Sequence, residues 1–309
     1  MQTLPIRIGT RGSRLALIQA EETKRRLIDA HGLAADDVTV VPISTTGDRI
    51  KDRSLSEIGG KGLFTKEIEA ALLDGEIDLA VHSMKDMPTV LPDGLIMGAM
   101  LPREDPRDAF LSMVATRISD LPPGSVLGTS SVRRRAQVKR LRPDILTVEF
   151  RGNVDTRLSK LRAGVAQATL LASAGLKRMG LDHEITSIIE PEEMLPALAQ
   201  GAIGLELRQD DERIAGLLAA LDHGPTSIAV LCERSFLGVL DGSCRTPIAG
   251  LCQLEGERIQ FRGMVLAPDG SDSCETVREG LISEAAALGR DAGEEILRRA
   301  GKAFFTEPH

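Results

Sequence analysis

Along most of the chain, short apolar runs alternate with longer segments whose apolar residues recur with the 3.6-residue period of a helix. In residues 14–30, for example, Ala16, Ala20 and Leu27 share one side and Glu21 lies on the other. Strands that alternate with helices indicate a mostly parallel sheet with helices on its faces. The pattern predicts strands at residues 6–8, 38–43, 78–81, 95–100, 125–127, 146–150, 169–172 and 203–207, and helices at 14–30, 66–73, 132–141 and 153–163.

The chain beyond residue 225 follows a different pattern. A helix predicted at residues 226–240 precedes three strand-like runs, around Ile248, at 259–266 and around Glu275, and a final helix covers 283–300. Pro268-Asp269-Gly270 is typical of a hairpin turn between the second and third runs. These features indicate a small α+β domain with an antiparallel sheet.

Three segments are harder to place. Residues 44–64 are rich in glycine, serine and charge, and such a connection is usually a functional lid or a disordered stretch. Residues 101–107 combine proline with charge, which is typical of a crossing between domains. Residues 196–221 hold a further strand and helix that could belong to the second domain or return to the first.

A candidate active site follows the third predicted strand. The chain changes there from apolar residues to a loop that holds His82, Ser83, Lys85 and Asp86, before Pro88 prevents a simple helical continuation. Polar loops at the carboxyl ends of strands carry the chemistry of open α/β sheets. We therefore expect Asp86 to be the catalytic carboxylate, although Lys85 and Asp86 could also simply solvate a loop.

Positive charge is concentrated in residues 131–162, which hold ten basic and three acidic residues in a chain of net charge −7. The overall charge argues against a general polyanion binder, whereas the local field favours anionic ligands. Arginines beside helix starts are the strongest candidates, because charge-assisted hydrogen bonds add about 1.5–3 kcal/mol each and a guanidinium suits carboxylates. Such candidates are Arg11, Arg133, Arg134, Arg151 and Arg157, with Arg178 and Lys61 as weaker additions. The residues deeper in their helices, expected to solvate helix faces, are Arg135, Lys139, Arg140, Arg142, Lys160 and Arg162.

Composition argues against several classes of function. Aromatic residues make up 2% of the chain, with no Trp or Tyr, so nucleic-acid binding by base stacking is poorly supported. No run of about 18 apolar residues is present, so no membrane span is expected. The first residues lack the apolar region of a secretory signal, and we expect a cytoplasmic protein.

The four cysteines are Cys232, Cys244, Cys252 and Cys274, and their spacings fit no zinc pattern. Disulfides are not expected in a reducing compartment. Cys244 differs from the others because it lies in a turn-rich loop with an arginine beside it. A thiol near a cation has thiolate character, so it can act as a nucleophile or as a point of covalent attachment.

Several motifs, in one order along the chain, resemble those of the porphobilinogen deaminase (hydroxymethylbilane synthase) family. The resemblance covers nearly the whole chain and is far more specific than any single motif. The matching segments are Thr10-Arg11-Gly12-Ser13-Arg14-Leu15-Ala16-Leu17, Gly59-Gly60-Lys61-Gly62-Leu63-Phe64, Val81-His82-Ser83-Met84-Lys85-Asp86-Met87-Pro88, Arg103-Glu104-Asp105-Pro106-Arg107-Asp108, Gly128-Thr129-Ser130-Ser131-Val132-Arg133-Arg134, Arg151-Gly152-Asn153-Val154-Asp155-Thr156-Arg157-Leu158, and Glu233-Arg234 through Gly242-Ser243-Cys244-Arg245-Thr246-Pro247.

The resemblance implies three domains. Domain 1 would span residues 1–101 with a return segment at 197–221, domain 2 would span 102–196, and domain 3 would span 222–309. The first two would be α/β domains with mostly parallel sheets, similar to periplasmic binding proteins, and the third would be the small α+β domain. The resemblance also implies a monomer without a metal, which can hand its product transiently to the next enzyme of the pathway.

The resemblance further implies a transferase of tetrapyrrole biosynthesis with a dipyrromethane cofactor, held by a thioether to Cys244. Four porphobilinogen units would be added head to tail with loss of ammonia, and hydroxymethylbilane would then be hydrolysed off. Asp86 would stabilise the cationic azafulvene that remains when ammonia departs. The residues implied to hold the cofactor are Ser83, Lys85, Thr129, Ser131, Arg133, Arg134 and Arg157, and those implied to hold substrate are Arg11, Ser13, Lys61, Phe64, Arg151, Arg157 and Arg178.

Two positions depart from the family pattern. Ala199 stands where the family often has glycine, and Ser243 stands where a glycine is frequent before the cysteine; we expect a slight adjustment of loop geometry at both. Two other functions are open on the residues alone. A non-catalytic anion-binding receptor would give Cys244 no role, and a ligand-sensing domain of a regulator would lack a preceding helix-turn-helix.

Overall fold

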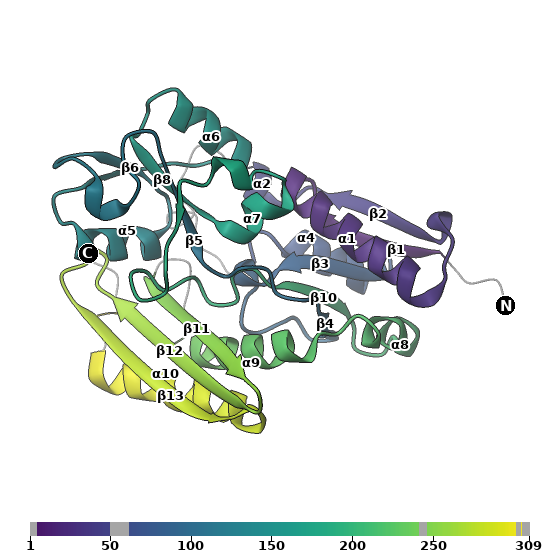
Figure 1. Cartoon of the computed structure of the whole chain (residues 1–309). Coiled ribbons are helices and arrows are strands. Elements are labelled where there is room, and N and C mark those ends of the chain that lie inside the picture. The colour runs from purple at the N-terminus through teal and green to yellow at the C-terminus, as the bar shows by residue number, and fades with distance from the viewer. Residues whose placement is uncertain (1–4, 50–61, 241–245, 301–303, 305–309) are drawn as a thin grey trace. The chain divides into compact units, whose positions relative to one another are not determined.

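The computed structural model describes residues 5–49, 62–240, 246–300 and 304 (Figure 1). These residues form two compact units. The first unit comprises the described residues up to 49 together with 62–104 and 201–227. The second comprises 105–200 and the described residues from 228 onwards. The chain therefore leaves the first unit after residue 104, returns to it at residue 201 and leaves again after residue 227.

The first unit contains a five-stranded sheet in which one strand is reversed. The strand order is β2-β1-β3-β10-β4, and β10 runs antiparallel to both of its neighbours while the other four strands share one direction. The reversed strand is contributed by the returning segment. The helices and strands of this unit are β1 (Ile6–Arg11), α1 (Arg14–His31), β2 (Val38–Ile43), α2 (Thr46–Arg49), α4 (Lys66–Leu73), β3 (Leu79–Ser83), β4 (Leu95–Met100), β10 (Ile203–Arg208) and α8 (Glu212–Ala219).

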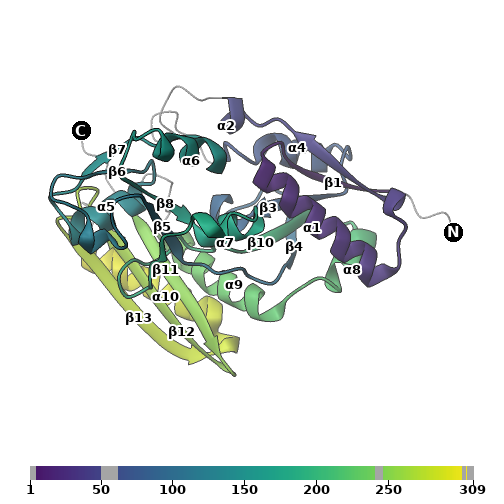
Figure 2. The same ribbon diagram turned by 45° about the horizontal axis from the view of Figure 1, so that its top comes forward.

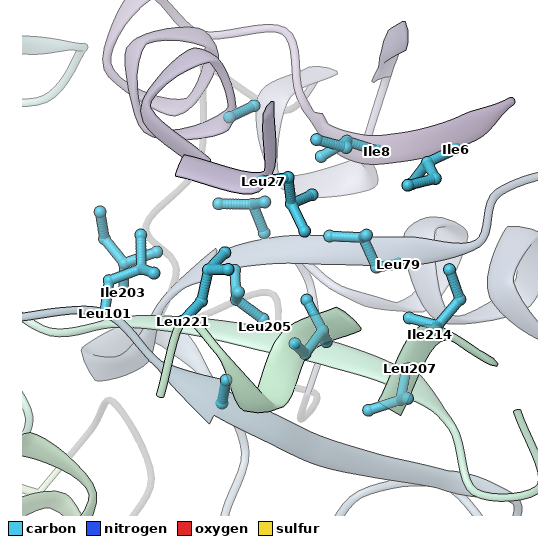
Figure 3. Close-up of a cluster of buried hydrophobic side chains, with 14 of the residues drawn as sticks. Ile6, Ile8, Leu27, Leu79, Leu101, Ile203, Leu205, Leu207, Ile214 and Leu221 are labelled. Atoms are coloured by element: carbon cyan, nitrogen blue, oxygen red, sulfur yellow. The ribbon is translucent and has the colours of Figure 1, made fainter. Parts of the chain in front are cut away.

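Helices cover both faces of this sheet, because its strands direct apolar side chains alternately to each side. On one face, Leu27 of α1 and Ile214 of α8 pack in one cluster with Ile8 of β1 (Figure 3). On the other face, Ile68 of α4 packs in a cluster with Ala80 of β3. The sheet is therefore buried on both sides, and its carboxyl edge is the place where polar loops can reach a ligand.

The second unit contains a sheet of the same kind. Its order is β7-β6-β8-β5-β9, and β5 is the reversed strand. Side chains of α5 pack on one face and those of α6 and α7 on the other. Figure 2 shows these helices around the sheet. Its elements are β5 (Asp108–Ser112), β6 (Val126–Gly128), α5 (Val132–Leu141), β7 (Leu146–Val148), α6 (Val154–Arg162), β8 (Ala168–Ala172), α7 (Ser173–Arg178) and β9 (Ser187–Ile188).

The C-terminal part forms a three-stranded antiparallel sheet in the order β11-β12-β13. One face packs on two helices, and the Phe236 and Phe261 rings meet edge to face there with centroids 5.0 Å apart. The other face packs on α5, where Leu251 and Met264 join the cluster of Ala136. The elements are α9 (Gly224–Val239), β11 (Ile248–Glu255), β12 (Arg258–Leu266), β13 (Ser273–Leu281) and α10 (Ala285–Ala300), which lies along the sheet (Figure 1).

The α/β class with parallel-rich sheets and a small C-terminal antiparallel sheet is confirmed. The elements predicted at 38–43, 66–73, 95–100 and 132–141 have those bounds in the structure. Sequence analysis did not predict β5, β9 or α7, which are short, and β5 is too deeply buried to show the alternation of a half-exposed strand. No single helix in the described ranges is long and apolar enough to cross a membrane. Helices α8 and α9 reach that length and apolar composition only when they are counted together, and the chain bends by 113° between them.

Candidate active site

β3 ends in a short turn that holds the candidate catalytic carboxylate. Met84–Asp86 form a 3₁₀ turn in which Met84 is buried and Lys85 and Asp86 are exposed. The Met84 N–H donates to the Ala202 carbonyl (3.0 Å), and the Met84 side chain lies against Gly204 of β10. The turn is thus fixed from the inside, while the Asp86 carboxylate is accessible to a ligand.

The two residues before this turn are also held by neighbouring elements. The His82 Nε2 atom lies 2.9 Å from a carboxylate oxygen of Glu206 on β10. The Ser83 hydroxyl is hydrogen-bonded to the Gln19 amide of α1, at 3.0 and 3.1 Å from its nitrogen and oxygen. Ser83, a predicted cofactor ligand, is therefore half-buried and already oriented by a helix.

The end of β1 brings Arg11 together with Phe64 and a carboxylate, and Ser13 follows at the start of α1. Ser13 caps α1 by accepting a hydrogen bond from a backbone N–H of the first turn (3.3 Å). The Arg11 Nε donates to Asp48 (3.2 Å), and the guanidinium carbon lies 4.1 Å from the centre of the Phe64 ring. Burial alone would raise the pKa of Asp48, but hydrogen bonds from Arg11 and Thr45 lower it below its usual value. The Arg11 guanidinium is therefore already engaged by a carboxylate of the protein.

Asp48 and Phe64 belong to the segment expected to form a lid. Its two described ends are joined, because the Gly47 N–H donates to the Leu63 carbonyl (2.8 Å). A Cβ added at Gly47 would meet the Phe64 ring at 2.2 Å, so the glycine permits this close packing. Residues 50–61, including the predicted substrate ligand Lys61, lie outside the described residues.

In the second unit, Arg133 and Arg134 share one buried carboxylate. Arg133 Nη1 donates to Asp108 (2.8 Å) and to the Leu195 carbonyl (2.8 Å). Arg134 donates to Asp108 from Nη2 (2.7 Å) and Nε (3.3 Å), and to the Leu170 carbonyl (2.9 Å). The side chain of Asp108 is 0% exposed and those of the two arginines are 7% exposed. Two cations against one anion leave this buried cluster with one positive charge in excess.

Gln200 completes the set of donors around Asp108. Its amide nitrogen donates to Asp108 (2.9 Å) and to the Pro106 carbonyl (2.7 Å). Burial alone would raise the pKa of Asp108, but the charges and hydrogen bonds of Arg133 and Arg134 hold it well below its usual range. The carboxylate therefore stays ionised and keeps both guanidinium groups in fixed orientations.

The turn between β6 and α5 holds the predicted hydroxyl ligands. The Thr129 side chain is buried and accepts a hydrogen bond from the Ser131 N–H (3.2 Å). Ser131 caps α5 by accepting from the Arg134 N–H (3.4 Å). Ser130 accepts from the Phe150 N–H (3.0 Å), which ties this turn to the next one. The helix start that carries the two buried arginines is therefore rigidly connected to the sheet.

Arg151 lies in the turn before α6, and Arg157 is the fourth residue of that helix. Gly152 between them has a φ of +116°, and a Cβ there would lie 2.6 Å from Thr156, so this turn requires glycine. Arg157 Nε donates to the Gly152 carbonyl (2.9 Å). One terminal nitrogen of Arg151, Nη1, is buried without a hydrogen-bond partner in the described part of the chain. An arginine donor in this state is suited to an anionic ligand.

Topology gathers the predicted residues at one edge of each sheet. In the first unit, the adjacent parallel strands β1 and β3 deliver Arg11 and Asp86 to the same carboxyl edge. In the second unit, β6, β7 and β8 are followed at that edge by Thr129, Arg151 and the helix that ends at Arg178, which is half-buried. Polar residues that follow strands in the sequence therefore mark the carboxyl edge of each of the two sheets. Cys244 and Ser243 lie outside the described residues.

At least half of the eight remaining basic residues of 131–162 have a carboxylate partner. Four of the residues expected to solvate helix faces have carboxylate partners instead of standing alone. The pairs are Arg135 with Glu149, Arg140 with Glu275, Arg142 with Asp144 and Arg162 with Glu184. The positive field is therefore smaller than the count of charges suggests, and the buried pair beside Asp108 is its most protected part.

The residues of these networks that sequence reasoning missed include Asp48, Asp108, Gln200 and Glu206. A carboxylate directly before or within an apolar run is the signal that was available for Asp108 and Glu206, because an isolated charge is rarely buried. No comparable signal exists for Gln200, whose contact with Asp108 joins residues 92 positions apart.

Comparison with known proteins identifies one family over nearly the whole chain. Residues 6–216 match the family described as porphobilinogen deaminase, dipyromethane cofactor binding domain, and residues 227–298 match the porphobilinogen deaminase C-terminal domain. The chain is 59% identical over 301 residues to the porphobilinogen deaminase of Paracoccus denitrificans, covering 97% of this chain and 96% of that protein. It is 57% identical over 299 residues to that of Nitrobacter hamburgensis, covering 97% and 95%. Among solved structures, it is similar to a periplasmic substrate-binding protein of an ABC transporter from Coxiella burnetii, with 15% identity, a TM-score of 0.45, and 74% and 94% of the two chains covered.

Proposed function

The chain belongs to the porphobilinogen deaminase family, and from this premise we propose that it joins four porphobilinogen units head to tail onto a covalently bound dipyrromethane and then releases hydroxymethylbilane. The observation that carries the proposal is the match of both family domains to a chain that is 59% identical to a curated relative along nearly its full length. The anion-receptor alternative does not account for the C-terminal match at residues 227–298. We further propose that the protein acts as a monomer in the cytoplasm.

The proposed reaction places a specific demand on Asp86. In each addition the aminomethyl C–N bond of porphobilinogen breaks, ammonia leaves, and positive charge develops on the pyrrole. A C–C bond then forms to the free α-carbon of the growing chain, and that carbon loses its proton. An ionised carboxylate held in place beside the pyrrole N–H stabilises the developing charge and can accept the proton. The exposed Asp86 carboxylate on a turn anchored at Met84 supports this role.

The residues of the second unit fit a group that carries several carboxylates. The Asp108 cluster has one positive charge in excess, and Arg151 has a buried donor without a partner among the described residues. We propose that Arg133, Arg134 and Arg157 bind cofactor carboxylates, with hydroxyl donors from Thr129 and Ser131 alongside. When bound, the dipyrromethane supplies the pyrrole α-carbon to which the first unit is added. Ser83 and Lys85 are the proposed cofactor ligands of the first unit, and Cys244 is the proposed attachment point.

Substrate carboxylates are assigned to the arginines at the two carboxyl edges. Arg11 is at present paired with Asp48, so a substrate carboxylate would share or replace that partner. Arg151, Arg157 and Arg178 are the proposed ligands in the second unit, and Lys61 is an additional one that lies outside the described residues. Ser13 and Phe64 complete the proposed set beside Arg11.

Intact mass spectrometry of the denatured protein tests this function. Protein made in cells that synthesise porphobilinogen is expected to carry the extra mass of two pyrrole units, and Cys244→Ser is expected to lack it. Cys274→Ser is the matched control, because that cysteine is buried in β13, and it is expected to keep the extra mass. Asp86→Asn should retain the adduct while losing about 100-fold or more in turnover of porphobilinogen. A bare polypeptide mass that persists after incubation with porphobilinogen would contradict the proposal.

A further inference from the structure

The residues in front of the catalytic turn are anchored to two different elements. Ser83 is hydrogen-bonded to Gln19 of α1, and Met84 is held against the segment that enters β10. His82 reaches across the sheet face to Glu206 of β10, with 2.9 Å between its Nε2 and a carboxylate oxygen. The last contact differs from the others because it is a pair of titratable groups with almost no exposed surface.

The His82–Glu206 pair lies on the face of the sheet that α4 covers. In the register of the two strands His82 is opposite Gly204, and Glu206 is opposite Ala80, so the carboxylate extends along the sheet to reach the imidazole. The side chain of His82 is 5% exposed and that of Glu206 is 0% exposed. A Cβ at Gly204 would lie 2.1 Å from the Met84 sulfur. β10 therefore packs against the Met84 side chain at Gly204, which has no side chain of its own. It contacts His82 through the Glu206 carboxylate.

This arrangement carries a cost in stability. Glu206 Oε1 is buried without a hydrogen-bond partner in the described residues, and such an oxygen loses its hydration. Glu69 of α4 is part of the same electrostatic environment: burial, together with the charge of Glu206, raises its pKa despite the opposing effect of His82. Apolar residues often replace a buried ion pair without loss of stability. Local arrangements that cost stability tend to occur where function requires them.

We propose that Glu206, acting through His82, is a positioning residue that fixes the end of β3 and thereby the place of the Asp86 carboxylate. This proposal rests on the function proposed for Asp86 and assigns the buried pair a part in it. A misplacement of about 1 Å can cost about 100-fold in rate, so even a small loosening of the turn has a measurable effect. The hydrogen bond of Ser83 and the packing of Met84 limit the loosening, and a smaller loss is expected.

The double variant His82→Leu/Glu206→Leu tests the proposal, because it removes the contact without leaving a buried charge alone. Its free energy of unfolding is expected to match or exceed that of the wild type. We expect kcat for porphobilinogen to fall about tenfold with KM changed less than about twofold, and amide hydrogen exchange in residues 82–88 to become about tenfold faster. Glu206→Gln keeps an acceptor for the imidazole N–H and is expected to restore slow exchange and most of kcat.

Asp78→Asn is the matched control. Asp78 is a buried carboxylate next to the opposite end of β3, where it accepts hydrogen bonds from Arg7 (2.8, 3.0 and 3.1 Å). Its replacement is expected to lower stability without changing kcat by more than about twofold or exchange in residues 82–88. A double variant with wild-type kcat and wild-type exchange overturns the proposal, and so does one that fails to fold. Amide hydrogen exchange can be measured without turnover. A wild-type protein that does not act on porphobilinogen but shows slow exchange in residues 82–88 would therefore contradict only the proposed function.

Discussion

The two five-stranded sheets each have one reversed strand, and each reversed strand carries a carboxylate with no exposed surface. Asp108 begins β5 in the second unit, and Glu206 lies within β10 in the first. The surroundings of the two carboxylates differ. Asp108 accepts hydrogen bonds from two guanidinium groups and an amide, whereas Glu206 has one imidazole partner and one oxygen without any partner in the described residues.

One sheet topology thus serves two electrostatic purposes. In the second unit, the carboxylate is outnumbered by cations and orients Arg133 and Arg134, so the cluster keeps an excess of positive charge for an anionic ligand. In the first unit, Glu206 contacts the His82 imidazole, and its charge contributes, after burial, to the raised pKa of Glu69. The proposed role of this second group is to hold the turn that carries Asp86.

Replacing Asp108 should lower the free energy of unfolding more than any other change proposed below. Asp108→Asn leaves two buried guanidinium groups without a counter-charge, and the loss of one partner from such a cluster costs about 3–5 kcal/mol. Urea unfolding at pH 7 measures the loss. Glu190→Gln is the control in the same unit, because Glu190 is 60% exposed beside Arg107 and its removal should cost less than about 1 kcal/mol.

The loss in Asp108→Asn should depend on pH in a defined direction. The pKa of Asp108 is lower in the folded protein than its ordinary value of 3.8, so its stabilisation is complete above about pH 4 and is lost as the pH falls towards the folded pKa. The difference between wild type and variant should be constant from pH 5 to 7 and shrink in acid. A difference that grows in acid would show that Asp108 is not held as an anion.

Much of the fold could be predicted from local pattern. The caps Ser13 and Ser131 and the bounds of α4 and α5 follow from side-chain chemistry within one turn of helix, which a sequence displays directly. β5 could not be predicted in the same way, because a five-residue strand buried on both faces has no alternation. Its reversed direction is a property of the whole chain path, since it follows from the crossing between the two units.

The candidate site likewise contains residues that could be predicted from the sequence and contacts that could not. Asp86, Thr129 and Arg151 follow strands, so their place at a carboxyl edge could be predicted from sequence. The sequence could not show that Arg133 and Arg134 share Asp108, because that contact joins residues 25 and 26 positions apart through the packing of a helix on a sheet. It was also unable to show that Arg11 has a carboxylate partner in Asp48.

In the first unit, Glu69→Gln should change the free energy of unfolding by a smaller amount than Asp108→Asn does in the second. Burial, with a contribution from Glu206, raises the pKa of Glu69 above its ordinary value of 4.5 in the folded protein. The folded state therefore loses stability as the pH rises from about 4.5 through the folded pKa. Removing the titration should leave stability unchanged at pH 4 and raise the free energy of unfolding at pH 7 by about 1 kcal/mol.

Glu76→Gln provides the matched control for this measurement. Glu76 follows the same helix but is exposed, and its replacement should not produce a difference between pH 4 and pH 7. Urea unfolding at both values measures the two variants side by side. If Glu69→Gln were less stable than the wild type at pH 7, the ionised Glu69 carboxylate would not be unfavourable in the folded protein, contrary to the expectation.

Ala199→Gly has the smallest expected effect and concerns the support of the Asp108 cluster. Ala199 has a φ of +58°, in the left-handed region that favours glycine, and its N–H donates to the buried Glu233 (2.5 Å). The strained residue immediately precedes Gln200, which donates to Asp108. Glycine should relieve a penalty of about 1–2 kcal/mol at an entropy cost of about 0.5–1 kcal/mol. The free energy of unfolding should therefore rise by about 0.5 kcal/mol, which a higher melting temperature would report. Ala197→Gly in the same loop lacks a positive φ and should instead lose about 0.5–1 kcal/mol, so equal losses in both variants would show that the conformation of Ala199 carries no strain.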